Sequence, residues 1–215
     1  MAKGRIGVGK HVSRWMSKDT EFYKAMYRCG SLTDRHLDAL NIKPGRAKDH
    51  VADRYVTTDT DKKTGETTYR LTKVGLDKCA ELGMNRAMNY QAQGTTQHRY
   101  HHDLKFADQY FKVYMDDKNK LDSWVNEREI GNLITGAIFN LKETDPAKYE
   151  EYSQMYADGK FSACDGGYWE VNQETGQEQL VLIEVVTSSY KASVVEAKMN
   201  TAMLLNAQYN PVFAR

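Results

Sequence analysis

The pattern of apolar and polar positions changes along residues 19–83 from helical spacing to strand alternation. Helical spacing predicts three helices, over residues 20–30, from Ser31 or Thr33 to Leu40, and over residues 46–55. Alternation predicts two strands, over residues 55–58 and 67–71, joined by a polar tip at residues 62–66. A fourth helix is expected after Thr72, which is a suitable N-cap. These residues therefore predict three helices, a β-hairpin and one further helix.

In residues 101–215 the pattern predicts helices followed by a small sheet. Helices are expected over residues 104–115 and over parts of 131–160, with Pro146 in a first turn. Strands are expected over residues 161–164, 168–171 and 179–187. The last of these is nearly all apolar, which is typical of a central strand covered on both faces, and Glu184 interrupts it. A final helix is expected over residues 188–209, with a buried face of Val194, Val195, Met199, Met203 and Leu204.

A polar stretch separates these two patterns. Residues 84–100 contain Gly94 and show little periodicity, so they are expected to form a linker. The predicted organisation is a basic arm at residues 1–18, a first domain at 19–83, the linker at 84–100 and a second domain at 101–215.

Composition narrows the class of protein. Of the 215 residues, 40% are hydrophobic and 27% are charged, which excludes a wholly disordered or collagen-like chain. No stretch approaches the ~18 consecutive apolar residues of a membrane span, and the N-terminus lacks the apolar core of a signal peptide. We therefore expect a cytoplasmic protein with no membrane partner. The three cysteines form no CxxC pair and are expected to be small buried side chains.

The net charge of +1 conceals a division between the two halves of the chain. Residues 1–100 carry 19 Lys and Arg against 11 Asp and Glu, a net +8, whereas residues 101–215 carry 11 against 18, a net −7. Such asymmetry favours two domains with different tasks, of which the basic one binds nucleic acid.

The first domain has the sequence features of a winged helix-turn-helix that binds double-stranded DNA. Basic residues of the predicted third helix are expected to face outward and to contact the major groove: Arg46, Lys48, His50 and Arg54. Further cations, in the arm and at the hairpin tip, are expected to contact phosphates: Lys3, Arg5, Lys62 and Lys63. A winged helix that binds protein is the alternative, and it predicts no affinity for DNA.

Two carboxylates of the second domain are candidates for a metal site. Asp165 begins the predicted hairpin and Glu184 lies on the neighbouring strand, so pairing can bring them to one edge. Two such carboxylates can hold Mg or Mn through oxygen ligands, and the metal can activate water for attack on a phosphodiester. Glu127 or Glu129 is a candidate third acid. In the alternative structural interpretation, Asp165 caps a turn and Glu184 pairs with a buried cation.

The spacing of these acids resembles the PD-(D/E)xK nuclease pattern. Its members here are Glu127 in Trp124-Val-Asn-Glu, Asp165 in Cys164-Asp-Gly-Gly and Glu184 in Ile183-Glu-Val-Val. With the preceding winged helix and His102-Asp-Leu, residues 19–210 resemble the replication-relaxation proteins of plasmids and integrative elements. The resemblance implies an α+β chain, with an N-terminal winged helix-turn-helix followed by a restriction-endonuclease-like domain. Its expected partners are double-stranded DNA and a relaxase or replication initiator, and the expected assemblies include a homodimer.

One departure from that pattern leaves the activity open. Val186 stands where the catalytic lysine of the family would stand, and Cys164 replaces the proline. Lys191 or Lys198 on the following helix is the candidate replacement for the lysine. Two functions are therefore expected: a DNA-binding accessory protein of a mobile element with an inactive nuclease-like domain, or an active Mg- or Mn-dependent endonuclease or nickase.

Overall fold

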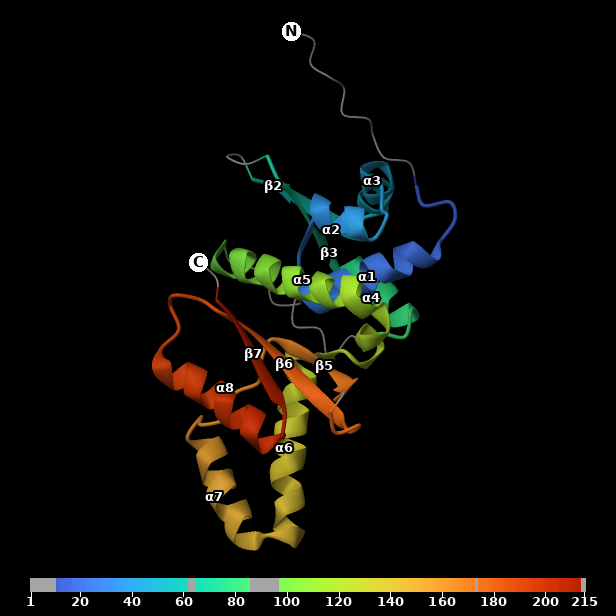
Figure 1. Ribbon diagram of the computed structural model, residues 1–215. Helices are drawn as coiled ribbons and strands as arrows, with labels where there is room; N and C mark the ends of the chain where they lie inside the picture. The colour runs from blue at the N-terminus through green and yellow to red at the C-terminus, as the bar shows by residue number, and fades with distance from the viewer. Residues whose placement is uncertain (1–10, 62–64, 86–96, 173, 214–215) are drawn as a thin grey trace. The chain divides into compact units, whose positions relative to one another are not determined.

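The computed structural model describes residues 11–61, 65–85, 97–172 and 174–213 (Figure 1). The fold is a mixture of helices and strands, so the expected α+β class is confirmed. The chain divides into two compact units, Met1–Phe111 and Lys112–Arg215, and their boundary falls within α5 (Gln97–Asp117). Most of the expected linker at residues 84–100 lies outside the described residues. None of the described helices is both long and apolar enough to span a membrane.

The first unit consists of helices around a small antiparallel sheet. Its elements before α5 are α1 (Ser17–Cys29), β1 (Leu32–Thr33), α2 (Asp34–Ala39), α3 (Pro44–Ala52), β2 (Val56–Thr60), β3 (Thr67–Leu71) and α4 (Lys73–Glu81). The strand order is β1-β3-β2, so the predicted hairpin is confirmed. The second helix begins at Asp34 with Thr33 as its N-cap, one of the two caps expected, and Leu32 and Thr33 also pair with β3 as an unexpected strand. Thr72 caps α4 as expected, and its hydroxyl accepts the N–H of Gly75.

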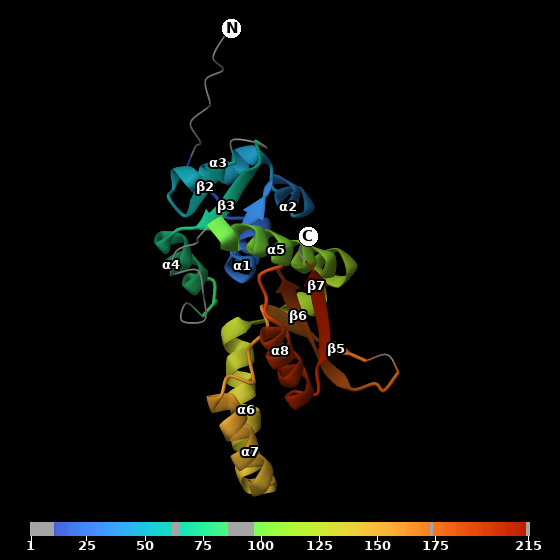
Figure 2. The same ribbon diagram turned by 90° about the vertical axis from the view of Figure 1, so that its left-hand side faces the viewer.

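The second unit contains a four-stranded sheet and three long helices. After α5 come η3 (Lys118–Ser123), β4 (Val125–Asn126), α6 (Glu127–Thr144), α7 (Pro146–Ala157), β5 (Gly166–Val171), β6 (Glu178–Val186), α8 (Ala192–Leu204) and β7 (Gln208–Phe213). The strand order is β4-β5-β6-β7, in which only β6 and β7 are parallel. Residues 180–186 are all buried, so the prediction of a central strand is confirmed (Figure 2).

The hydrophobic core of the second unit lies between the sheet and its helices. Ile130, Ile134 and Ile138 recur at four-residue spacing along α6, which places all three on one face. They cluster with Leu180 and Leu182 of β6 and with partly buried side chains of α7. The three cysteines of the chain are free and buried, as expected.

The edges of this sheet are occupied in different ways. β4 contributes only two residues beside β5. Further along β5, the Ser123 hydroxyl takes the place of a strand: it accepts the N–H of Trp169 at 3.0 Å and donates to its carbonyl at 2.9 Å. The opposite edge is β7, which contains Pro211.

Two predicted elements of the second unit are wrong. Residues 161–164 form no strand, because α8 side chains bind their backbone instead: Thr201 Oγ1 accepts the N–H of Ser162 and donates to its carbonyl. The last helix ends at Leu204 rather than at residue 209. Asn206 adopts a left-handed φ of 49°, and the chain then returns beside β6 as β7.

The predicted buried face of α8 is wrong for its two methionines, whereas Val194, Val195 and Leu204 are half-buried. Met199 and Met203 are 50% and 72% exposed, whereas Ala197, Lys198, Thr201 and Ala202 are buried. The short alanine and threonine side chains let α8 lie close to residues 161–163, while the buried lysine meets Glu184 of β6. An internal ion pair therefore outweighs the burial of two methionines in setting the rotation of this helix.

Close packing of β5 against β6 predicts a steric requirement for glycine. A Cβ added at Gly167 would lie 2.4 Å from the carbonyl oxygen of Val181, which belongs to the backbone. Gly167→Ala should therefore destabilise the protein by about 2 kcal/mol, because the strands must separate. Gly136→Ala is the matched control in α6, where the added methyl meets no atom within 4 Å. It should stabilise by about 0.5–1 kcal/mol through helix propensity. Urea unfolding of both variants measures the difference, and equal effects would contradict this interpretation.

Candidate functional site

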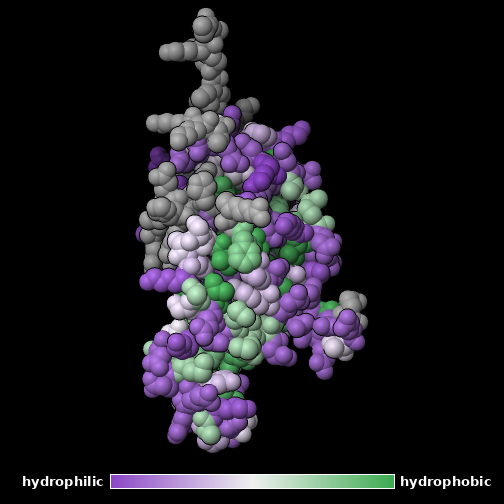
Figure 3. Space-filling model, turned by 60° about the vertical axis from the view of Figure 1, so that its left-hand side comes forward, coloured by the Kyte–Doolittle hydropathy of each residue, from purple (hydrophilic) through white to green (hydrophobic). Residues whose placement is uncertain are grey.

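The α3 helix and its flanks carry exposed basic side chains of the first unit. Lys43 precedes α3, Lys48 lies within it, and Arg54 follows it with a left-handed φ of 61°. All three are exposed. Figure 3 shows that this end of the first unit, at the top of the picture, is mainly hydrophilic where it is not covered by grey atoms.

Two of the four residues expected to face DNA from this helix are engaged inside the protein. His50 is fully buried, so the expectation that it faces outward is wrong: its ring hydrogen-bonds to Asp19 and to the hydroxyl of Tyr23, both at 3.0 Å. Arg46 donates from Nε and Nη2 to the two carboxylate oxygens of Asp19, at 2.9 and 2.5 Å. It also donates to the backbone carbonyl of Arg14 at 2.6 Å. Lys48 and Arg54 are exposed as expected.

This internal network has a clear electrostatic origin. Burial alone would raise the pKa of Asp19, but hydrogen bonds from Arg46, His50 and the Met16 backbone lower it below its usual value. Burial lowers the pKa of His50, although Asp19 acts in the opposite direction. A buried carboxylate thus attaches α3 to the start of α1. The other predicted phosphate contacts, Lys3, Arg5, Lys62 and Lys63, lie outside the described residues.

In the second unit, strand register brings three acids into one row. β4 pairs with β5 up to Gly166, and β5 pairs with β6 from the same residue. Extended by one position, these registers set Asp165, which precedes β5, opposite Glu184 of β6, and Glu127, the first residue of α6, opposite Asp165. Consistent with this, the charges of Glu127 and Glu184 both raise the pKa of Cys164, after the larger effect of burial.

Hydrogen bonds link two of these acids closely. Glu184 is fully buried, and its Oε2 accepts the backbone N–H of Asp165 at 3.1 Å. The carboxylate of Asp165 accepts the N–H of Val185 at 2.7 Å. Each acid therefore helps to position the other, and the predicted meeting of Asp165 and Glu184 at one edge of the hairpin is what the structure contains.

A buried lysine completes the cluster. Lys198 Nζ lies 3.1 Å from Glu184 Oε2, and it also donates to the carbonyl of Ala163. Lys191, the other candidate, is exposed at the N-cap of α8, and no contact joins it to the acids among the described interactions. The sequence signal that favours Lys198 over Lys191 is helical spacing, because Lys198 lies on the same face of α8 as the buried Thr201 and Ala202.

Two further residues, Glu129 and Tyr190, differ in their interactions. Glu129 serves the α6 capping box: its Oε2 accepts the N–H of Asn126 at 2.8 Å, which leaves Glu127 as the acid nearest the cluster. Tyr190, which the sequence did not single out, acts to lower the pKa of Glu184. Burial and the neighbouring acids raise the pKa of the Tyr190 hydroxyl, so it stays protonated.

The charged groups of the cluster shift one another's pKa. Burial and the charge of Asp165 raise the pKa of Glu184 to about 7, against the opposing effects of Lys198 and Tyr190. Burial would lower the pKa of Lys198, but the charges of Glu184 and Asp165 raise it above its usual value. The second oxygen of Glu184, Oε1, is buried and has no hydrogen-bond partner.

Mg²⁺ is commonly held by one or two carboxylates together with water, and Asp165 and Glu184 provide such a pair. The unpartnered Oε1 is the atom that a cation would satisfy. Among the described residues, no group of three or more His, Cys, Asp and Glu side chains is arranged to hold a metal by itself.

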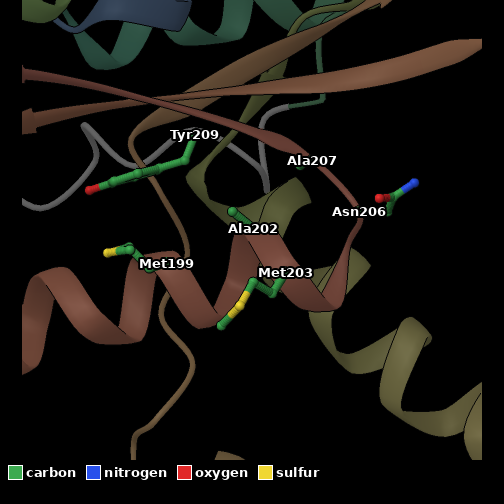
Figure 4. Close-up of a pocket in the computed structure, with 6 residues that line it drawn as sticks. All are labelled: Met199, Ala202, Met203, Asn206, Ala207 and Tyr209. Atoms are coloured by element: carbon green, nitrogen blue, oxygen red, sulfur yellow. The ribbon is translucent and has the colours of Figure 1, made fainter. Parts of the chain in front are cut away.

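A pocket of about 430 Å³ lies beside α8 and β7 (Figure 4). Met199, Ala202 and Met203 of α8 form one side of it. Asn206, Ala207 and Tyr209 complete the lining, which contains no carboxylate, amine or imidazole. The pocket therefore offers apolar contact rather than acid–base chemistry.

Comparison with known proteins adds no family to these observations. No protein-family model, curated protein or solved structure matches the chain. Function is therefore inferred from the α3 surface and the carboxylate–lysine cluster.

The buried His50 predicts that the first unit loses stability in acid. Because its folded pKa is lowered, the unfolded chain binds more protons below the ordinary histidine pKa of about 6.5. Stability is therefore complete above that pH and falls below it, by at most about 1.4 kcal/mol per histidine between pH 7.5 and 5.5. Hydrogen exchange of α1 and α3 amides at the two pH values measures this change.

His50→Gln is the matched variant, because glutamine keeps a polar side chain that does not titrate. Its α1 and α3 amides should show a smaller change with pH than those of the wild type. The buried His36, whose pKa burial also lowers, supplies a remaining dependence in both proteins. An identical loss of protection in the two proteins would show that His50 is not responsible.

Proposed function

We propose that this protein is a DNA-binding phosphodiesterase, an Mg- or Mn-dependent endonuclease or nickase that binds duplex DNA through its first unit. The observation that carries the proposal is the convergence of Asp165, Glu184 and Lys198. Val186 occupies the lysine position of the PD-(D/E)xK pattern, and Lys198 brings an ammonium group to the same cluster from α8. Lys198 is thus the replacement for the missing motif lysine, and this favours an active domain over an inactive one.

The order of elements in the first unit supports the DNA-binding half of the proposal. Helices α1, α2 and α3 precede the β2–β3 hairpin, and β1 joins the hairpin as a third strand. A winged helix-turn-helix has this order, with its third helix facing the major groove and its hairpin beside the phosphates. The exposed cations Lys43, Lys48 and Arg54 lie on or next to that helix.

The residues of the second unit have separable chemical tasks. Asp165 and Glu184 would hold the metal. When bound, the metal would lower the pKa of a coordinated water and stabilise negative charge on the phosphate. The ammonium of Lys198 remains protonated, so it can orient a water or offset the charge of the attacked phosphodiester. The backbone N–H of Asp165 orients the Glu184 carboxylate. Glu127 adds negative charge at the same edge.

A non-catalytic accessory protein is the second candidate. Two observations favour it: Val186 replaces the motif lysine, and Lys198 is paired with Glu184. This ion pair stabilises the fold whether or not the site catalyses a reaction. For either candidate, we propose a role in plasmids or integrative elements, on the basis of the resemblance to replication-relaxation proteins. A relaxase or a replication initiator is then the proposed protein partner.

Duplex binding is the first expected outcome. The wild type should bind a short DNA duplex, and its affinity should fall steeply as salt rises. Lys48→Ala should weaken binding about fivefold at ~150 mM salt and reduce the salt slope by about 0.9, the effect of one lost phosphate contact. Lys148→Ala on α7 removes the same charge from the second unit and should change neither value. Fluorescence anisotropy measures both the affinity and the salt slope. An absence of binding at low salt would instead favour a winged helix that binds protein.

Metal-dependent nicking is the second expected outcome. With Mg²⁺ or Mn²⁺, the wild type should convert supercoiled plasmid to nicked circles. Lys198→Met should slow the reaction by about 10²-fold or more, the usual contribution of one positioned group that stabilises charge in the transition state. Asp165→Ala should abolish it. Gel electrophoresis of time courses measures the rates.

The exposed Lys191 provides the matched control for that experiment. Lys191→Met makes the same chemical change on the same helix and should retain the wild-type rate. Circular dichroism of both methionine variants checks that the fold persists. A plasmid that stays supercoiled with both metals would favour the accessory protein, and equal rates in the two variants would remove Lys198 from the site.

A further inference from the structure

The segment that precedes α1 is attached to α3. We call residues 11–16 the stem, because they connect the basic residues of the N-terminus to the first helix. Val12 donates its backbone N–H to Asp53 Oδ2 at 2.8 Å, and the ring of His11 bonds to Oδ1 of the same carboxylate. Asp53 is the C-cap residue of α3. Both oxygens of this carboxylate therefore hold the stem at the end of α3.

Contacts continue along the stem as far as α1. Arg46 of α3 binds the carbonyl of Arg14, as described above. Trp15 packs edge-on against Tyr23 and His50, with ring centroids 4.9 and 5.5 Å apart, and its Nε1 donates to Thr20 Oγ1 at 2.9 Å. The stem thus lies along the helix proposed to contact DNA, although most of its residues are exposed.

The position of Asp53 is electrostatically unfavourable apart from these contacts. A carboxylate at a helix C-terminus opposes the helix dipole. On a DNA-facing helix it also repels phosphates. Its side chain is nevertheless only 15% exposed, because the stem covers it. The bonds to His11 and Val12 are the stabilising interactions that the structure offers for this carboxylate.

We infer that Asp53 is a positioning residue for DNA binding: it fixes the stem, which follows the cations of the N-terminal arm in the sequence, to the end of α3. Those cations are Lys3, Arg5 and Lys10. The inference rests on the proposed duplex binding and identifies a residue on which the arm depends. Asp53 need not touch DNA, since its effect passes through the stem.

For Asp53→Ala, the expected change in DNA affinity is opposite to the change that the loss of a negative charge alone would cause. Removing a carboxylate from a DNA-binding surface ordinarily tightens binding, because it removes repulsion. Asp53→Ala should instead weaken binding of a duplex by full-length protein about tenfold at ~150 mM salt, and it should reduce the salt slope by about one to two. Asp59→Ala is the matched control, since it removes the same charge from an exposed site on β2. It should leave binding unchanged or tighter.

A second background separates positioning from damage to α3. In a variant with Lys3, Arg5 and Lys10 all changed to alanine, Asp53→Ala should no longer weaken binding, because no arm charge remains to be positioned. Hydrogen exchange over residues 11–16 should become faster in Asp53→Ala, which reports release of the stem.

Each remaining result overturns the inference. Tighter binding by Asp53→Ala, as for Asp59→Ala, would mean that the carboxylate acts only by its charge. Equal weakening with and without the arm cations would assign its effect to α3 itself. A wild type that binds no duplex at any salt concentration would fail the proposed function first, and the positioning role with it. These results are distinguishable within one set of anisotropy titrations.

Discussion

The buried carboxylate of Glu184 is the constraint on which the second unit depends. A charge in the middle of a central strand is costly unless a cation and hydrogen bonds accompany it. Lys198 supplies the cation and the backbone of Asp165 a hydrogen bond. To deliver that lysine, α8 must turn its small side chains inward and leave Met199 and Met203 outside. The proposed chemistry and the packing of the last helix are therefore consequences of one ion pair.

The first unit follows the same physical principle with a different result. Asp19 is fully buried at the start of α1, and it draws Arg46 and His50 of α3 toward the interior. The outward-facing positive charge of α3 is thereby reduced, and of the four basic positions predicted to contact DNA only Lys48 and Arg54 are exposed. A helix that looks broadly basic in sequence presents a narrower basic surface when folded.

The features that sequence predicted correctly are those determined by neighbouring residues. The β2–β3 hairpin, the buried β6 strand and the placement of Asp165 opposite Glu184 follow from alternation and turn chemistry, which are local. The errors at residues 161–164 and at the face of α8 have a distant cause. In both places side chains of α8 bind groups about 14 to 40 residues away, and no periodicity reports such partners. The burial of His50 likewise depends on Asp19, which lies 31 residues earlier.

The edges of the second unit's sheet bear on how the protein behaves in solution. Exposed strand edges invite other chains to add strands, which leads to aggregation. Here one edge strand has only two residues, and a serine hydroxyl satisfies both backbone groups of Trp169 beyond its end. The other edge carries a proline, which has no N–H to donate. The sheet is thus a poor template for amyloid-like growth, and self-association of this unit has to use side-chain surfaces rather than an extended ladder.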